Sequence, residues 1–175
     1  MTRQCQHILL LGNDAMNMKV GQNGIALFVE WEGLKHQVYS DTGGEPTIGI
    51  GHLLTRDERR SGKIRISGLC IDYRNGLTTE QCYQLLEQDV AIAEKSVNDS
   101  VHIELNQNQF DALVSLAFNI GGSAFRASTL VKLLNQKQYD KVPVQMRRWV
   151  RDNGKVIQGL VNRREKEIAL WNTPV

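Results

Sequence analysis

The feature of the sequence that most constrains the fold is a long helical pattern that begins at Thr78. Thr78 and Gln81 match a capping box, in which each side chain accepts a hydrogen bond from the other residue's backbone N–H. The residues that recur at helical spacing after this start are Cys82, Leu86, Val90, Ala93 and Val97. A helix over residues 79–99 is therefore expected, and the two parts of the chain that flank it differ in composition.

The part before this helix is rich in turn signals. The segment 33–77 holds more than half of the chain's 15 glycines, and turn-forming residues at 41–44 precede a short run of strand-forming residues at 46–51. This pattern indicates a small antiparallel sheet. Ahead of it, Ile25, Phe28 and Val29 have helical spacing, so a helix is expected to end near Gly33.

The part that follows residue 100 has helical periodicity. The apolar stripe of its first helix is formed by Phe110, Leu113, Val114, Ala117 and Phe118. The pair Gly121-Gly122 is expected to end this helix. Shorter helices are expected at 128–137, 139–151 and 160–171.

The predicted fold class is therefore α+β and mainly helical, with two lobes. The domain consists of a sheet lobe at about 21–78, a connecting helix at about 79–99 and an all-helical lobe at about 100–175. Residues 1–20 have weak periodicity and are expected to be an N-terminal extension. A cleft between two such lobes is a usual place for a binding or catalytic site.

Composition places the chain among ordinary globular proteins, with 175 residues, 41% apolar and 23% charged. The apolar run Ile8–Leu11 is too short to span a bilayer or to form the core of a signal peptide, so folding in a cytoplasm is expected. An odd number of cysteines without close pairing argues against a disulfide scaffold. Cys5, Cys70 and Cys82 are expected to be free thiols, with Cys82 half-buried on a helix.

Charge is unevenly distributed along the chain. Residues 1–100 carry 10 basic and 13 acidic side chains, a net −3, while residues 101–175 carry 11 and 6, a net +5. A basic half favours an anionic polymer such as nucleic acid, lipid headgroups or cell wall as a partner. Ordinary surface charge explains the same distribution equally well, because the excess is spread over the whole segment.

Glu32, Asp41 and Thr47 lie where their side chains can converge: at the end of a helix, in a turn and at the start of a strand. Glycoside hydrolysis needs such a set, since one acid protonates the leaving oxygen and a second carboxylate handles the water or the cationic sugar. From their spacing alone, however, Glu32 and Asp41 are better explained as ordinary solvated charges on the surface. The rival acids are Glu30, on another face of the helix, and Glu45, at the hairpin tip.

A resemblance to a known family changes this balance. Glu32 is followed after eight residues by Asp41 and after five more by Thr47, which opens the run Thr47-Ile48-Gly49-Ile50-Gly51-His52. This pattern resembles the signature of the phage-type lysozymes, in particular those of T-even phages. The resemblance covers about residues 24–172, and its further matches are Glu87-Gln88-Asp89-Val90, Phe118-Asn119-Ile120-Gly121, Arg148-Trp149 and Gly159–Glu165.

The resemblance implies a lysozyme-like fold and a muramidase, which hydrolyses the β-1,4 bond between N-acetylmuramic acid and N-acetylglucosamine in peptidoglycan. By position, Glu32 is the general acid and must hold its proton near neutral pH, which partial burial favours. Asp41 stays ionised, stabilises the oxocarbenium-like sugar and, with Thr47, holds the attacking water. The family is expected to invert the anomeric centre, so that the two carboxyl groups stand roughly 6.5–9.5 Å apart.

The resemblance also assigns supporting roles. His52 and Asp89 are expected to form an ion pair between the sheet lobe and the long helix, with the histidine structural and not a metal ligand. Arg163 is expected beside Glu32, with a surface position as the alternative. The residues that match positions lining the glycan cleft are Leu53, Phe118 and Ser128. Core packing of the two apolar residues and capping of a helix by the serine are the alternatives.

The resemblance implies that the chain is an endolysin, and neither a cofactor nor a metal is expected. Its expected partner is the peptidoglycan glycan strand, without nucleic acid binding or stable membrane insertion. It is expected to accumulate as a monomer in the host cytoplasm, and to reach the periplasm and cell wall after a holin has permeabilised the membrane. The alternatives are a virion-associated lysozyme and an idle peptidoglycan-binding domain, against which the intact Glu32, Asp41 and Thr47 argue.

Overall fold

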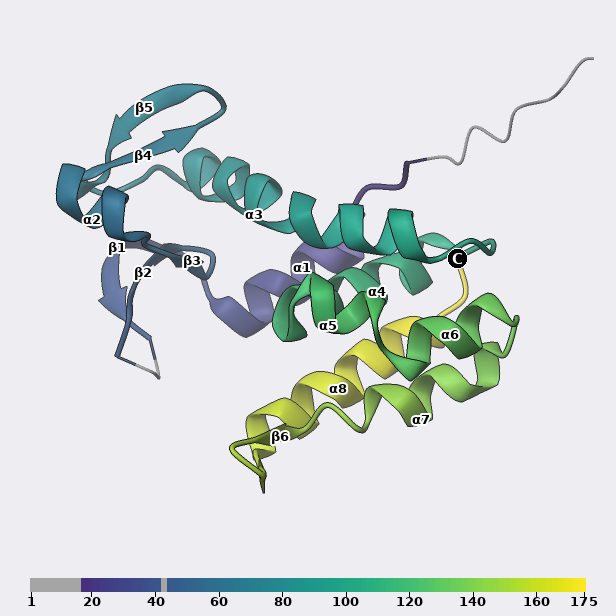
Figure 1. Ribbon diagram of the computed structural model, residues 1–175. Helices are drawn as coiled ribbons and strands as arrows, with labels where there is room; N and C mark the ends of the chain where they lie inside the picture. Colours follow the sequence, from purple (N-terminus) through teal and green to yellow (C-terminus); the bar gives the residue numbers. More distant parts are fainter. Residues whose placement is uncertain (1–16, 42–43) are drawn as a thin grey trace, which may run out of the picture.

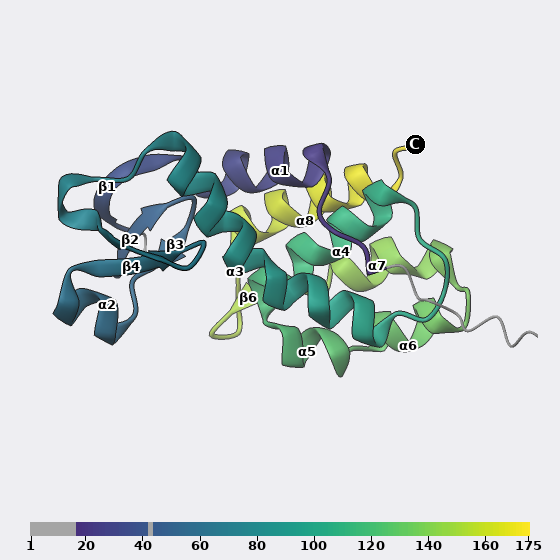
Figure 2. The same cartoon turned by 90° about the horizontal axis from the view of Figure 1, so that it is seen from above.

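The computed structural model describes residues 17–41 and 44–175. Helix α3 (Thr79–Ser100) runs from a small lobe of strands to a larger lobe of helices (Figure 1). Seen from above, the two lobes lie at opposite ends of α3 (Figure 2). The predicted architecture, a mainly helical α+β fold with small antiparallel sheets, is confirmed.

The sheet lobe contains three antiparallel strands in the order β1-β2-β3, followed by a separate hairpin. Its elements are β1 (Lys35–Ser40), β2 (Pro46–Gly49), β3 (His52–Leu53), α2 (Arg56–Ser61), β4 (Lys63–Ile66), β5 (Leu69–Asp72) and the 3₁₀ turn η1 (Tyr73–Asn75). The register pairs Tyr39 with Thr47 and Thr47 with Leu53, so these three residues lie side by side across the sheet.

The helical lobe is organised around α4 (Gln107–Ile120), in which every residue from Phe110 to Ala117 is buried. Helix α4 packs against α3, α1 (Gln22–Glu32) and α8 (Gln158–Trp171). The remaining elements are α5 (Gly122–Arg126), α6 (Thr129–Asn135), the 3₁₀ turn η2 (Tyr139–Lys141), α7 (Val142–Met146) and the hairpin of β6 (Arg151–Asp152) and β7 (Lys155–Val156). Helix α1 therefore belongs to this lobe by packing, although it precedes the sheet in the chain.

Local sequence signals account for the main helix ends. Gln81 donates its backbone N–H to Thr78 Oγ1 at 3.1 Å, and Thr78 donates its own to Gln81 Oε1 at 2.8 Å, so the predicted capping box forms. Gly33 and Gly121 follow α1 and α4 with φ of 69° and 89°. A side chain rarely adopts such a φ, and both helices end where the glycines predicted.

The predicted helix over 139–151 is wrong. The chain forms the short elements η2 and α7, and then turns through the β6–β7 hairpin. Pro143 is the second residue of α7, in the first turn of a helix, where a residue without a backbone N–H to donate is tolerated. Asn153 and Gly154 both have positive φ, 47° and 78°, and form the two-residue turn of the hairpin. An Asn-Gly pair is a hairpin signal that the sequence already contained.

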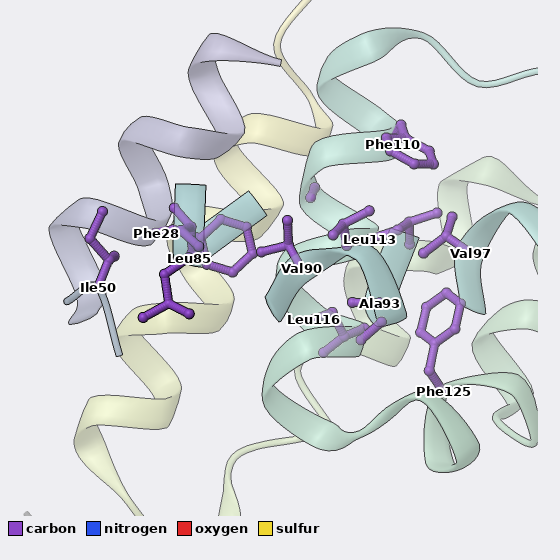
Figure 3. Close-up of a cluster of buried hydrophobic side chains, with 14 of the residues drawn as sticks. Phe28, Ile50, Leu85, Val90, Ala93, Val97, Phe110, Leu113, Leu116 and Phe125 are labelled. Carbon is purple, nitrogen blue, oxygen red and sulfur yellow. The ribbon is translucent and has the colours of Figure 1, made fainter. Parts of the chain in front are cut away.

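One hydrophobic core extends through both lobes and along α3. At its centre, Phe28 of α1 and Leu85 of α3 lie close together, with Ile50 beyond them on the sheet side (Figure 3). Cys82 also belongs to this core and is fully buried, so the expectation that it is half-buried is wrong. Cys70 is exposed as a free thiol, and Cys5 lies outside the described residues.

The segment just before α1 is bound to the helical lobe. Met18 exchanges two hydrogen bonds with Asn98, both 3.0 Å, and Val20 donates its N–H to Glu94 at 2.8 Å. Buried Asp111 accepts the N–H groups of Gly21 and Gly24, so a carboxylate from α4 caps the start of α1. Of the predicted extension, residues 17–20 are therefore attached, whereas residues 1–16 lie outside the described part of the chain.

Candidate active site

Glu32 is the last residue of α1, where Gly33 ends the helix and turns the chain into β1. Its side chain is 24% exposed, and its Oε1 accepts a hydrogen bond of 2.8 Å from Arg163 Nη1. Arg163 comes from α8, 131 residues further along the chain, and only 9% of its side chain is exposed. The predicted neighbour of Glu32 is therefore in place and fixes one of its carboxyl oxygens.

Gly51, in the turn between β2 and β3, lies directly against Glu32. A Cβ at Gly51 would stand 2.8 Å from Glu32 Cγ and 2.9 Å from Glu32 Oε2, closer than real contacts allow. The φ of Gly51 is also +74°, a conformation that favours glycine. The glycine of the Ile-Gly-x-Gly-His run therefore makes room for the carboxyl group of Glu32.

Asp41 follows β1 and forms the turn that leads to β2. Its Oδ1 accepts the N–H of Glu45 at 2.8 Å, and its backbone N–H bonds the carbonyl of Glu45 at 3.0 Å. Thr47 lies in β2 with 3% of its surface exposed, and its hydroxyl donates to the same carbonyl at 3.1 Å. Asp41 and Thr47 are thus both hydrogen-bonded to the backbone carbonyl of Glu45.

Tyr39 interacts electrostatically with both carboxylates, although no role was predicted for it from the sequence. Its pKa lies above the usual 10.0, first because of burial and then because of the negative charges of Glu32 and Asp41. Both carboxylates therefore lie within electrostatic reach of one phenol. The sequence contained a signal for this proximity: Tyr39 and Asp41 are two positions apart in an extended segment, and side chains two positions apart in a strand lie on the same face.

The rival acids lie in other surroundings. Glu30 is exposed, forms an ion pair with Lys166, and lines a groove of about 620 Å³ between α1 and α3. Glu45 is 58% exposed and stands 3.4 Å from Arg59. Neither shares the partially buried position of Glu32 at the helix end.

His52 joins the sheet lobe to α3. Its Nδ1 lies 2.9 Å from Asp89 Oδ2, as predicted, and its Nε2 lies 3.2 Å from Glu58 Oε2, a partner that the sequence did not reveal. Burial lowers the pKa of His52, but the hydrogen bonds and charges of Asp89 and Glu58 outweigh it and the pKa lies above 6.5. Within the described ranges no cluster of side chains suited to a metal ion is present.

Replacing Asp89 with asparagine is expected to destabilise the protein more at pH 5.5 than at pH 9. The raised pKa of His52 stabilises the folded state fully below the unfolded value of 6.5, and this contribution is lost as the pH rises through the folded pKa. A loss of about 1–2 kcal/mol is expected at the lower pH. Urea unfolding at both pH values measures it, with Asp99→Asn, which removes an exposed ion pair of the same helix, as control. Equal losses at the two pH values would contradict the pairing.

The three predicted substrate-binding residues lie in different environments. Leu53 is 53% exposed on β3, so it is not a core residue. Phe118 is half-buried and packs edge-on against Phe28 with ring centroids 5.1 Å apart. Ser128 caps α6 by accepting the N–H of Val131, and it also lines a groove of about 480 Å³ together with Trp149. Ser128 therefore both caps a helix and lies in a groove.

Comparison with known proteins decides the family. The family model described as phage lysozyme matches residues 29–167, which include Glu32, Asp41, Thr47 and Arg163. The chain belongs to the phage lysozyme family. The resemblance noted in the sequence is thereby confirmed, and with it the assignment as a lysozyme-family glycoside hydrolase.

Three relatives illustrate the range of this lysozyme's family. The endolysin of Salmonella phage P22 is 39% identical over 154 residues, 88% of this chain and 98% of the relative. The endolysin of Bacillus phage PZA is 37% identical over 158 residues, 89% of this chain but 56% of the relative, so the lysozyme spans about half of that protein. A SAR-endolysin of Escherichia phage Mu is 33% identical over 144 residues, 82% of this chain and 75% of the relative.

Solved structures agree with the fold. A crystal structure of a mutant P22 lysozyme matches with a TM-score of 0.73 and 36% identity, covering 89% of this chain and 99% of that one. The muramidase domain of SpmX from Asticaccaulis excentricus matches with a TM-score of 0.67 and 32% identity, with the same coverage of both chains. The mainly helical α+β architecture is therefore shared with phage lysozymes.

Replacing Gly51 with alanine is expected to slow the lysozyme at least about tenfold, because the new methyl group displaces Glu32 from its position. The strained φ and the contact also cost roughly 1–3 kcal/mol of stability. Gly68→Ala is a matched control, because Gly68 has a φ of +83° but a Cβ there would meet no other part of the described chain within 4 Å. Initial rates of cell-wall cleavage and thermal melts measure both effects. Equal rates for the two variants would show that the contact with Glu32 is unimportant.

Proposed function

We propose that this lysozyme hydrolyses the β-1,4 bond between N-acetylmuramic acid and N-acetylglucosamine in peptidoglycan, with inversion at the anomeric carbon. The observation that carries the proposal is the arrangement around β1. Glu32, held by Arg163 and backed by Gly51, and Asp41, in the turn after β1, both lie within electrostatic reach of Tyr39. Two carboxyl groups, one on the helix end before β1 and one in the turn after it, are the set that glycoside hydrolysis requires.

In this mechanism Glu32 is the general acid and donates its proton to the leaving glycosidic oxygen. Arg163 orients the carboxyl group through Oε1, and its positive charge stabilises the carboxylate that proton transfer leaves behind. Asp41 stabilises the developing positive charge on the sugar and accepts a hydrogen bond from the attacking water. The hydroxyl of Thr47 donates to Glu45, so its lone pairs remain to accept the second hydrogen of that water.

Substrate binding is assigned to residues on both lobes. Exposed Leu53 on β3 offers an apolar face to a sugar ring, and Phe118 lies at the end of α4 near the junction of the lobes. Ser128 and its groove, which Gln145, Arg148 and Trp149 also line, provide hydrogen-bond donors and acceptors on the helical lobe. A polymer that crosses from one lobe to the other would contact all three.

The decisive experiment follows the products of the wild-type protein on purified peptidoglycan. New reducing ends are expected, and proton NMR at early times is expected to show the α-anomer first, because inversion of a β bond yields the α product. The β-anomer first would contradict inversion and leave hydrolysis intact. Binding to sedimented walls without new reducing ends would instead support the idle binding domain.

The proposed place of action is the cell wall of the phage host. We place the protein first in the host cytoplasm, with a holin needed for access to the wall. Among residues 17–41 and 44–175 no helix has the length and apolar character to cross a membrane. The relative from phage Mu bears the name SAR-endolysin, so the family contains more than one named type of endolysin.

A further inference from the structure

A row of four charged side chains leads from Glu32 into the interior of the helical lobe. Arg163 donates from Nη1 to Glu32 at 2.8 Å and from Nε to Glu167 Oε1 at 3.4 Å. Glu167 then pairs with Arg164, whose Nη2 lies 2.9 Å from Oε1 and whose Nε lies 2.7 Å from Oε2. The side chains of Glu167 and Arg164 are completely buried. Negative and positive charges therefore alternate along the row.

The two arginines differ in how firmly they are held. Arg164 also donates to Asn119 Oδ1 at 3.0 Å and to the carbonyl of Trp149 at 3.3 Å. Arg163 donates to the carboxylates of Glu32 and Glu167, while its buried Nη2 has no hydrogen-bond partner among the residues that the structure describes. Ser115 of α4 donates to Glu167 Oε1 at 2.7 Å and so fixes Glu167. The orientation of Arg163 therefore depends on both carboxylates, of which Glu167 is the anchored one.

We propose that Glu167 is a positioning residue for glycoside hydrolysis: it shares Arg163 with Glu32, so that Glu32 is not the sole counter-charge of a buried arginine. The inference rests on the proposed role of Glu32 as general acid. An arginine beside a carboxyl group favours its ionised form, whereas a general acid must be protonated when substrate binds. A second carboxylate on the same guanidinium offsets that pull while Arg163 still orients the acid.

Among the described residues, the titratable and polar groups that face the row come from α1, β1, α4 and α8. Arg163 of α8 faces Glu32, and Tyr39 of β1 interacts with both Glu32 and Asp41. Glu167 faces Arg163 and Arg164 from its own helix and Ser115 from α4. The pKa of Glu167 lies above its usual value, because burial raises it more than the two arginines and Ser115 lower it. The arginines favour the ionised form of Glu167 against burial, and one of them is the arginine that it shares with Glu32.

The test is the pH profile of Glu167→Gln, measured as kcat on soluble peptidoglycan fragments. This variant keeps the shape of the side chain and the oxygen that Ser115 bonds, but removes the charge. The pH at which kcat falls to half on the alkaline side is expected to move down by about half a unit or more. Glu167→Asp keeps the charge and is expected to keep the wild-type profile, even if its melting temperature is lower. Equal profiles for wild type and Glu167→Gln, or equal shifts for both variants, would overturn the inference.

Glu167→Gln leaves a buried arginine unpaired, which can prevent folding, so a double variant serves as a second test. Arg164→Met combined with Glu167→Gln removes both buried charges. Because Arg164 lies beyond Glu167 in the row, a smaller shift in the same direction is expected, and an unchanged profile would overturn the inference. Glu165→Gln, which breaks an exposed ion pair of the same helix, is expected to change nothing. If the wild-type protein forms no reducing ends, the proposed function and this inference are both wrong. If the wild-type protein is active but Glu167→Gln does not shift the pH profile relative to Glu167→Asp, only this inference is wrong.

Discussion

Replacing Glu32 with glutamine is expected to slow peptidoglycan cleavage about a thousandfold. The amide keeps the size of the side chain and an oxygen that can accept the hydrogen bond from Arg163, but it has no acidic proton for the leaving oxygen. Loss of this one proton is therefore expected to abolish most of the activity and to leave the fold intact. The clearing of a suspension of bacteria with permeabilised outer membranes, together with release of reducing ends, measures the effect.

Glu30→Gln is the matched control for this experiment. Glu30 lies on the same helix two positions earlier, but it is exposed and pairs with Lys166. Its replacement is expected to leave the rate within about twofold of wild type, because exposed ion pairs contribute little. Lysis by Glu32→Gln at the wild-type rate would disprove the assignment of the acid, and loss of lysis in Glu30→Gln would point to the neighbouring face of α1.

Replacing Phe28 with alanine is expected to destabilise the protein by about 3–5 kcal/mol. Phe28 is 0% exposed and lies at the centre of the core, against Leu85 of α3 and edge-on to Phe118 of α4 (Figure 3). The protein interior relaxes only partly around such a deletion, so a cavity remains where the ring was. A fall of roughly 6–20 °C in melting temperature is the expected observation.

Phe28→Leu provides the comparison for this variant. Leucine fills much of the same volume, so a loss of at most about 1.5 kcal/mol is expected. Because Phe28 precedes Glu32 by one helical turn on α1, the alanine variant is also expected to lose activity well below its melting temperature, whereas the leucine variant keeps it. A free energy of unfolding, from urea denaturation, within about 1 kcal/mol of wild type for Phe28→Ala would show that the core does not depend on this ring.

Elements with strong local signals were predictable from the sequence. The capping box of Thr78 and Gln81 located the start of α3, and Gly33 and Gly121 located two helix ends, because caps and left-handed turns are decided by neighbouring residues. The predicted helix over 139–151 failed although its signals were local as well. Pro143 and the Asn153-Gly154 pair are both in the sequence, and in the structure Pro143 lies in the first turn of α7 and Asn153-Gly154 forms the hairpin turn.

The candidate site was predictable to the extent that it is local. Glu32, Asp41 and Thr47 lie within one short segment, at the end of a helix and in the hairpin that follows it. Arg163 was expected only through the family resemblance, since no spacing rule connects residues 131 positions apart. The contact of Gly51 with Glu32 was missed for a related reason: a glycine in a strand pattern has several explanations, and only the packed structure shows what occupies the space of its absent side chain.

Sequence by itself determined the helix boundaries marked by caps and glycines, the small sheet, and the short segment that carries the two carboxylates, because these depend on interactions between near neighbours. The tertiary structure alone decided that Glu167 and Arg164 are completely buried and that Glu58 joins His52. A charged residue on a helix is ordinarily a surface residue, and nothing in its neighbours says otherwise. Its burial is stable only when other elements supply opposite charges and hydrogen bonds, and those partners meet only in the folded chain.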